Sequence, residues 1–432
     1  MAPLKRTDEE RDLLARATRA MPGGSLGNMR LSGDDAFIVR DGTGSRIRDL
    51  SGNEYIDYVL GSGPMILGHA HPKVVAAAEE ALRKGSTFFV ENAYAIELAE
   101  RIVDAVPCAE QVRFTTSGTD ATFQCLRLAR VFRKRDKILK FEGGFHGTHD
   151  YAAMSVRPSG TVPFPAPEPS SAGIPKAVQD TVLVAPYNDI ETTAGLIEQH
   201  HDELAAVIVE PVQRTIAPQD GFLAGLRDIT GRFGIPLIFD EVVTGFRLAY
   251  GGAQEAYGVT PDLAAIGKII GGGFPLAAAV GRRELLEAYD ATAVPPQGFV
   301  PQVGTLNGNP VAAAAGLATL AELREPGRYA AYHATGAHLR TTLQRLFDEA
   351  EIPAVVSGVD VVFDVYFTDR PVVDYRSTLG DKTLKRVFDQ TLLEHGVLKT
   401  PEKFYVGMCH GETDVEETIA AFEAGVAAVR EA

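Results

Sequence analysis

The 432-residue sequence contains no tryptophan and only three cysteines, Cys108, Cys125 and Cys409. The cysteines are far apart and odd in number, which argues against a disulfide framework and against a cysteine-ligated metal site. No stretch approaches the ~18–20 consecutive apolar residues of a membrane-spanning helix. The N-terminus is charged where a secretory signal would be apolar. We therefore predict a cytoplasmic protein that binds no metal and spans no membrane.

Basic residues are also scarce, since 42 Lys and Arg stand against 57 Asp and Glu, for a formal net charge of −15. So acidic a surface repels phosphate backbones and anionic lipids. Nucleic acid and membrane are therefore not expected partners. Hydrophobic residues make up 45% of the chain and charged residues 23%, which is ordinary globular composition.

Strand-like and helix-like runs alternate through the middle of the chain, with buried strands predicted at "LAAVIVEP" (204–211) and "IPLIFDEV" (235–242). This alternation predicts an α/β fold with a mainly parallel sheet covered on both faces. Three short strand-like runs between residues 36 and 59 predict an antiparallel meander. We predict a large domain over 74–324, and a small α+β domain built from both termini, 1–73 and 325–432.

Asp240 and Lys268 stand out in this central region. Asp240 ends the apolar run "LIFDEV", and ligands of open α/β sheets collect beyond the carboxyl ends of strands. Lys268 lies among apolar residues and glycines in "AAIGKIIGGG", where desolvation lowers the pKa of an amine and makes it nucleophilic. Taken singly, Asp240 could be a helix cap or an ion-pair partner, and Lys268 a surface lysine with a buried stem.

Two further turns follow predicted strands. "TTSGTDA" (115–121) places Ser117, Gly118 and Thr119 at a helix N-terminus, where free backbone N–H groups bind phosphate, although an ordinary N-cap is the simpler interpretation. "FEGGFHG" (141–147) offers Phe145 as a flat face with His146 beside it. A phosphate site, an aromatic face, an acid and an amine nucleophile are together what pyridoxal 5'-phosphate (PLP) requires.

The chain resembles the class III PLP-dependent aminotransferases of fold type I, and within that family it is most similar to the glutamate-1-semialdehyde 2,1-aminomutases. The stretches that carry the resemblance extend over nearly the whole length: "MPGG", "DLSGNEYIDYVLGSGPMILGHAHP", "TTSGTDAT", "KFEGGFHG", "VIVEPV", "IFDEVVTGFR", "GKIIGGGFPLAAAVGRRE" and "GTLNGNP". Each is weak singly, and their order and spacing are specific.

The resemblance implies a role for each matching position. Lys268 would be the Schiff-base lysine, and Asp240 the partner of the pyridine nitrogen. The remaining implied roles are phosphate binding by Ser117, Gly118 and Thr119; ring contacts by Phe145, His146 and Val242; a hydrogen-bonding network that includes Glu210; phosphate binding across a homodimer by Thr305; and binding of a substrate carboxylate by Arg30.

The sequence departs from the aminomutase pattern at positions that are expected to contact the substrate. The N-terminal loop reads "LGNMR", with Gly27 where a serine is expected, and "LGSGPM" lacks an expected aromatic. The stretch "KTPEKFYVGMCHG" has Glu402 and no arginine for an α-carboxylate. If Arg30 binds the carboxylate instead, the reacting amine would lie further along the substrate, as in a β-amino acid.

These observations leave several functions open. The first is an aminotransferase that acts on an amino acid or amine, possibly a β-amino acid, and on an oxo-acid acceptor. The second is an aminomutase that moves the amino group within one molecule, and the third is a racemase or epimerase. A non-catalytic regulatory protein on the same fold is a fourth, disfavoured by the intact Lys268 and Asp240 and by the absence of a basic domain.

Overall fold

The computed structural model of the chain describes residues 5–27, 31, 35–158 and 162–432. Its centre is a seven-stranded sheet in the order β4-β10-β9-β8-β7-β5-β6. The strands are β4 (Gln111–Thr115), β5 (Lys137–Phe141), β6 (Val182–Ala185), β7 (Leu204–Val209), β8 (Leu237–Glu241), β9 (Leu263–Ile266) and β10 (Ala277–Gly281). β10 pairs antiparallel with both β4 and β9, and the other four strand pairs are parallel, so the predicted mainly parallel sheet is confirmed.

Alternate residues of each strand enter two different cores, one on each face of the sheet. On β8, for example, Ile238 packs with α4 on one face, whereas Leu237 and Phe239 belong to the core on the other. Near-continuous apolar strands of this kind follow from burial on both faces. The helices of this region are α2 (Pro72–Lys84), α3 (Ala93–Ala105), α4 (Gly118–Arg133), α5 (Lys176–Gln179), α6 (Ile190–His200), α7 (Phe222–Arg232), α8 (Gly252–Tyr257), α9 (Arg283–Leu286) and α10 (Pro310–Leu323).

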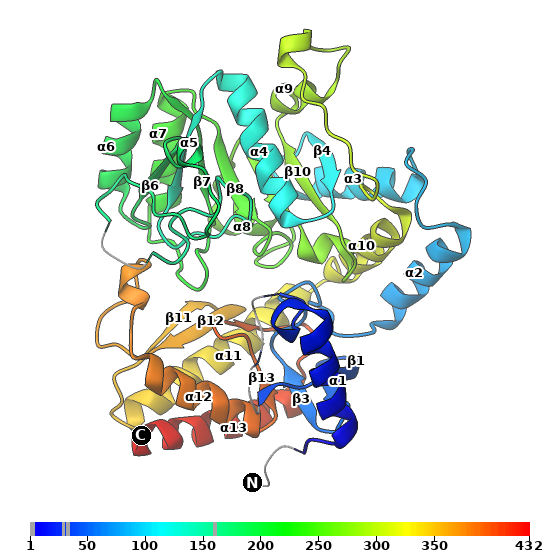
Figure 1. Cartoon of the computed structure of the whole chain (residues 1–432), viewed down its shortest axis with the longest axis vertical. Helices are drawn as coiled ribbons and strands as arrows, with labels where there is room; N and C mark the ends of the chain where they lie inside the picture. The colour runs from blue at the N-terminus through cyan, green and yellow to red at the C-terminus, as the bar shows by residue number, and fades with distance from the viewer. Residues whose placement is uncertain (1–4, 28–30, 32–34, 159–161) are drawn as a thin grey trace.

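The two ends of the chain meet below the large sheet (Figure 1). The N-terminal strands form the predicted antiparallel meander, and β13 of the C-terminal segment pairs in parallel with β3. The elements are α1 (Asp8–Ala20), β1 (Val39–Thr43), β2 (Arg46–Asp49), β3 (Glu54–Asp57), α11 (Arg328–Glu349), β11 (Val355–Val359), β12 (Val362–Tyr366), α12 (Lys382–Glu394), β13 (Val397–Leu398), β14 (Phe404–Tyr405) and α13 (Glu412–Glu431). The division into a large domain and a small domain built from both termini, with limits at 73/74 and 324/325, stays a prediction.

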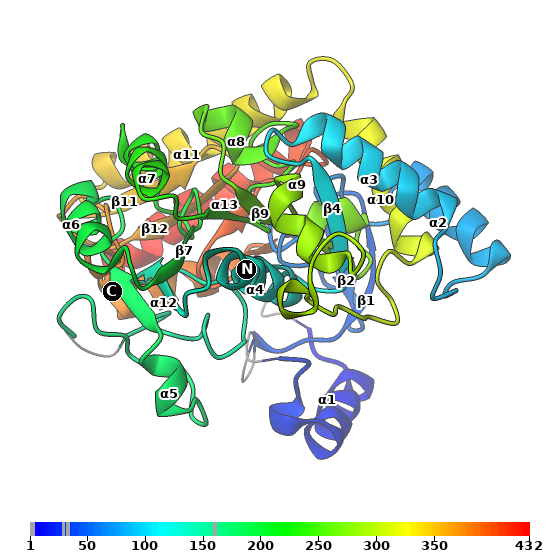
Figure 2. The ribbon, with the colours of Figure 1, turned by 90° about the horizontal axis from the view of Figure 1, so that it is seen from above.

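Seen from above, α2, α3 and α10 lie together on one side of the molecule (Figure 2). α10 begins at Pro310 after Asn309, whose side chain accepts a hydrogen bond from the Ala312 N–H at 2.9 Å. In the part of the chain that the structure describes, no helix has both the length and the apolar composition needed to span a bilayer.

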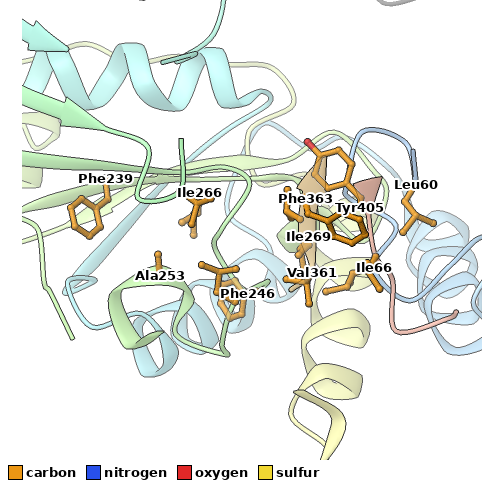
Figure 3. Packing of buried hydrophobic residues seen from close by; sticks show 14 of the residues in the cluster. Leu60, Ile66, Phe239, Phe246, Ala253, Ile266, Ile269, Val361, Phe363 and Tyr405 are labelled. Carbon is orange, nitrogen blue, oxygen red and sulfur yellow. The ribbon is translucent and has the colours of Figure 1, made fainter. Parts of the chain in front are cut away.

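One apolar cluster connects the large sheet to the terminal segments (Figure 3). It extends from Phe239 and Ile266 under the sheet, through Phe246, to Phe363 and Tyr405 on the neighbouring three-stranded sheet β11-β12-β14. Because Tyr405 is packed into this core, its ring is held at a fixed place relative to the ends of β8 and β9.

Candidate active site

A cavity of about 390 Å³ lies beyond the carboxyl ends of the parallel strands. This is where open α/β sheets bind ligands, because the loops that follow several parallel strands converge there. The structure brings most of the predicted site residues to its wall: Gly118, Thr119, Phe145, His146, Glu210, Asp240, Val242 and Lys268. They lie at or just after the ends of β4, β5, β7, β8 and β9. One edge of the sheet therefore brings together residues that are up to 150 positions apart in the chain (268 − 118).

Asp240 is buried at the end of β8 and has two partners. Its Oδ1 accepts the Val242 N–H at 3.1 Å, and its Oδ2 lies 2.9 Å from His146 Nδ1. Burial raises the pKa of Asp240 to about 7 and lowers the pKa of His146 to about 3, so His146 is neutral at pH 7. Within the described part of the chain, no lysine or arginine forms an ion pair with this carboxyl, and a protonated ring nitrogen facing it would stabilise its ionised form.

Lys268 extends from the loop after β9 into the same cavity. Its Nζ donates a hydrogen bond to the Ser62 carbonyl at 2.8 Å. Burial lowers the pKa of the Lys268 amine; Lys403 and Arg247 add to this, and Tyr405 and Asp240 oppose it. The backbone of Lys268 has φ +52°, a conformation that a non-glycine residue adopts at an energetic cost and one that is common at functional sites. A lysine so placed is suited to nucleophilic attack on a carbonyl.

The start of α4 forms one end of the cavity. As the first helical residues, Gly118 and Thr119 present backbone N–H groups that the helix cannot pair, which suits a phosphate group. A side chain at Gly118 would not fit, because its Cβ would lie 2.9 Å from both γ-carbons of Val242. The helix N-terminus and the Val242 side chain are therefore in direct contact.

The loop after β5 carries Phe145 and His146, and buried polar side chains form hydrogen bonds with its backbone. The Phe145 N–H donates to Glu210 Oε2 at 2.9 Å, and the Phe145 side chain remains 41% exposed. Fully buried Lys140 donates to the carbonyls of Gly144 and Ala152 at 2.9 and 3.0 Å, and also to the carbonyl of Met154. Burial lowers the pKa of Lys140 to about 7; the charge of Glu210 opposes this shift and that of Arg214 adds to it.

Two predicted residues that the structure describes do not line this cavity, and a third cannot be placed. Ser117 caps α4, and its Oγ accepts the Asp120 N–H at 3.2 Å. Thr305 is exposed on the loop before α10, away from the cavity of its own subunit. Arg30 lies outside the described residues. The phosphate roles of Ser117 and Thr305 and the carboxylate role of Arg30 therefore stay predictions.

Several wall residues come from segments to which sequence reasoning gave no role. Ser62 lies in a run from Leu60 to Gly63 in which every residue has positive φ, and such a run has no periodic signature. Lys403 and Tyr405 enter from the loop after β13 and from β14. Their stretch, "KTPEKFYVGM", drew attention only for Glu402. Burial raises the pKa of Tyr405, yet Lys403, Lys268 and Arg247 outweigh burial and lower it to about 8.

Arg214 is a further residue that the sequence reasoning missed. Its guanidinium lies 5.1 Å from the centre of the Phe145 ring, its Nε donates to the Gly143 carbonyl at 3.3 Å, and its Nη1 lies 3.4 Å from Glu402 Oε2. In the sequence, Arg214 could have been noticed because it follows Glu210 by four residues, close to the end of a predicted strand. Arg157, Arg214 and Lys403 give the outer wall of the cavity more positive than negative charge.

The residues present fit PLP. Lys268 would hold its aldehyde carbon, Asp240 its ring nitrogen, Phe145 and Val242 its two ring faces, and the start of α4 its phosphate. The strongest observation is the Asp240 carboxyl at the cavity wall, whose pKa is raised by burial and whose ionised form a protonated ring nitrogen would stabilise.

Known aminomutases and transaminases are similar to this chain over nearly its whole length. A glutamate-1-semialdehyde 2,1-aminomutase of Methanothermobacter thermautotrophicus is 43% identical over 419 residues, covering 95% of this chain and 97% of that protein. The structure of an omega-transaminase from Sphaerobacter thermophilus superimposes with a TM-score of 0.93, at 38% identity and 98% coverage of both chains. A transaminase with PLP bound gives 0.90 at 30% identity, with 99% of both chains covered.

A beta-phenylalanine aminotransferase from Variovorax paradoxus gives a TM-score of 0.85 at 29% identity, covering 96% of this chain and 93% of that one. The family model described as "Aminotransferase class-III" matches residues 31–403. The chain is therefore a member of the class III aminotransferase family, a fold type I enzyme with pyridoxal 5'-phosphate as its cofactor.

Proposed function

We propose that the chain is an aminotransferase that moves an amino group between an amino acid or amine and an oxo acid. The observation that carries this proposal is that one cavity is lined by Lys268 and Asp240 together with the cationic Arg157, Arg214 and Lys403. Oxo acids and amino acids carry carboxylates, and a wall of guanidinium and ammonium groups attracts them.

In this proposal the protein residues bind, orient and move protons, while PLP, when bound, serves as the electron sink that lets a Cα–H bond break. Lys268 first holds the cofactor. Once an incoming amine had taken its place, Lys268, whose pKa burial lowers, would be suited to accept the substrate Cα proton and to return it one position away. Asp240 keeps the ring nitrogen protonated, and His146 holds the Asp240 carboxylate in place through the 2.9 Å contact.

The substrate is proposed to carry a carboxylate bound by Arg30, as inferred from sequence, which favours β-amino acids among the possible donors. The beta-phenylalanine aminotransferase name of one structural relative supports this class. The missing serine and aromatic of the aminomutase pattern, at Gly27 and in "LGSGPM", argue against strict aminomutase activity.

The aminomutase is the second candidate, and the names of the curated relatives favour it over intermolecular transfer. The same Lys268 and Asp240 would serve it, because both reactions move a proton and an amino group on one cofactor. The two differ only in whether the substrate leaves between the halves of the reaction.

A single-turnover experiment separates the two candidates. The PLP form is mixed with L- and D-alanine, L-glutamate, β-phenylalanine, β-aminobutyrate and an arylalkylamine, and the cofactor spectrum and released oxo products are followed. Conversion with release of an oxo acid supports the aminotransferase, and selectivity for β-amino acids supports the Arg30 anchor. Silence across the panel, together with isomerisation of glutamate-1-semialdehyde, would replace it with the aminomutase.

A homodimer with shared active sites is also proposed. A groove of about 380 Å³ between α3 and the loop before α10 is bordered by Phe89, Val90 and Val303, which are all exposed, and Thr305 lies on this surface. Exposed apolar surface of this kind marks an interaction site. If Thr305 serves the partner's phosphate, mixing inactive Lys268→Ala and Thr305→Ala subunits should restore activity, because a mixed dimer contains one intact site. Mixed dimers without activity would exclude the sharing.

A further inference from the structure

The connection between β12 and α12, residues 367–381, reaches from the C-terminal segment toward the large sheet. In Figure 1 it includes the orange turn at the left of the molecule, above α12. Its Val373 carbonyl accepts a hydrogen bond from Asn188 Nδ2 at 2.9 Å. Within the connection, Ser377 Oγ accepts the N–H groups of Val373 and Asp374 at 2.9 and 3.0 Å. The connection is therefore braced internally and docked against the segment that follows β6.

Arg376 of this connection pairs with Glu142, the residue directly after β5. Its Nε and Nη2 donate to the two oxygens of the Glu142 carboxylate at 2.8 and 2.9 Å, and Nη2 also donates to the Val162 carbonyl at 3.1 Å. The guanidinium carbon lies 4.6 Å from the centre of the Phe164 ring. The Glu142 side chain is 6% exposed, and in the described part of the chain no second cation pairs with it. Loss of Arg376 would therefore leave a buried carboxylate without its ion pair.

Tyr375, the neighbour of Arg376, packs on the main chain of Gly143. A Cβ added at Gly143 would lie 2.7 Å from the Tyr375 Cβ and 2.8 Å from its Cδ2, and the φ of Gly143 is +84°, which favours glycine. The Tyr375 hydroxyl donates to the Pro158 carbonyl at 3.4 Å. The connection thus contacts two successive residues of "FEGGFHG", the side chain of Glu142 and the backbone of Gly143.

These two residues begin the loop that carries Phe145 and His146. The Glu142 carbonyl accepts a hydrogen bond from the buried Gln213 Nε2 at 2.8 Å. Three residues after Glu142, Phe145 lies at the cavity wall, and one residue later His146 Nδ1 lies 2.9 Å from Asp240 Oδ2. Over so short a stretch, a shift of the Glu142 backbone displaces both the aromatic face and the His146 contact.

We infer that Arg376 is a positioning residue for the cofactor: by holding Glu142 it fixes where the loop of Phe145 lies, and so how the PLP ring is oriented. The inference goes beyond the proposed function, because it holds whichever amino-group reaction the enzyme catalyses. The geometry of the cofactor site then depends on the docking of the 367–381 connection. A pair that served stability alone would leave the bound cofactor unchanged when it was broken.

The test titrates the apoprotein with PLP. Visible absorbance gives the Kd, visible circular dichroism of the bound cofactor reports the orientation of its ring, and thermal unfolding of the apoprotein reports stability. For Arg376→Gln we expect the Kd to rise at least about tenfold, the equivalent of ~1.4 kcal/mol, and the dichroism per bound PLP to change, because a charge-assisted pair of hydrogen bonds is lost. Arg376→Lys keeps the charge without the planar fork, so both values should lie between those of the wild type and Arg376→Gln.

Arg46→Gln is the matched control. Arg46 Nε and Nη2 donate to Asp414 Oδ1 at 3.1 and 2.9 Å, the Asp414 side chain is 10% exposed, and neither residue lines the active-site cavity. Breaking this pair should lower the unfolding midpoint, as Arg376→Gln does, while the Kd of PLP and the dichroism of the bound cofactor stay at their wild-type values.

The double variant Arg376→Gln/Glu142→Gln shows whether the two residues act through one contact. Its Kd should be no higher than that of Arg376→Gln, because an uncharged amide removes the unpaired carboxylate, and a higher value overturns the inference. A wild-type Kd or wild-type dichroism in folded Arg376→Gln overturns it as well, and so does an equal rise of the Kd in Arg46→Gln. Should Arg376→Gln not fold, a wild-type Kd or dichroism in Arg376→Lys decides in the same way.

Discussion

Gly118→Ala adds one methyl group where the phosphate site meets the ring site. Gly118 is the first residue of α4, and an added Cβ would lie 2.9 Å from both Cγ1 and Cγ2 of Val242, closer than real side-chain carbons approach. The φ of Gly118 is not in the left-handed region, so the effect is purely steric. Either the helix start or the Val242 side chain must shift, and each of these shifts changes the space that the cofactor needs.

The size of the effect follows from overpacking, which typically costs about 1–3 kcal/mol. Without cofactor, Val242 can turn into the cavity, so the unfolding midpoint of the apoprotein should change little. When PLP is bound, it fills the space into which Val242 would turn, so the strain should weaken PLP binding. At about 1.4 kcal/mol per factor of ten, the Kd of PLP should rise roughly 5- to 150-fold. The assay is equilibrium titration of apoprotein with PLP, followed by cofactor absorbance, beside thermal unfolding of the apoprotein.

Gly195→Ala on α6 is the matched control. Among the residues that the structure describes, no atom outside its own helix lies within 4 Å of the Cβ that would be added at Gly195, so alanine should stabilise the helix by about 0.5–1 kcal/mol and leave PLP binding unchanged. Wild-type PLP affinity in Gly118→Ala would refute the steric argument. An apoprotein destabilised by the full overpacking cost would show that the fold, rather than the site, absorbs the strain.

Lys268→Ala should abolish turnover while PLP still binds without a covalent link; steady-state activity within a few fold of wild type would contradict its role. Asp240→Asn should lower kcat/KM by several orders of magnitude, because an amide cannot balance a protonated ring nitrogen, and a small loss would argue against that pairing. In the apoprotein, Tyr405→Phe should remove a tyrosinate absorbance that titrates near pH 8. Lys403 and Arg247 help hold that pKa below the ordinary 10, so stability gained by ionising Tyr405 appears as pH rises from about 8 to about 10; a titration unchanged in the variant would assign it elsewhere.

The sequence predicted the architecture well where periodicity and burial act together. Near-continuous apolar runs identified β7 and β8 as buried strands, and the position of Asp240 at the end of β8 placed it at the ligand-binding edge. The direction of β10 was not predicted, because an apolar run indicates that a strand is buried but not which way it runs relative to its neighbours. The connection from Ile266 to Ala277 is short for the helical crossover that a parallel pair needs, and β10 accordingly runs antiparallel to β9.

Site residues that follow strands of the large sheet could be predicted from the sequence. Those that tertiary packing brings to the cavity from distant segments could not. Tyr405 reaches Lys268 because β14 pairs with β12, a pairing between residues about 40 positions apart that local pattern does not encode. Ser62 accepts the Lys268 hydrogen bond from a loop of positive-φ residues, two of them not glycine, whose conformation only the folded surroundings impose.

The two groups of site residues also differ in how freely they can change. Asp240 and the loop of Phe145 are built onto strands packed on both faces, and buried Lys140 binds that loop through its carbonyls, so substitutions there disturb the core as well as the cofactor site. Glu402 instead lies in a partly exposed loop held by ion pairs. Substrate contacts can therefore diverge while cofactor contacts persist, which is how relatives named aminomutase and transaminase can share this fold.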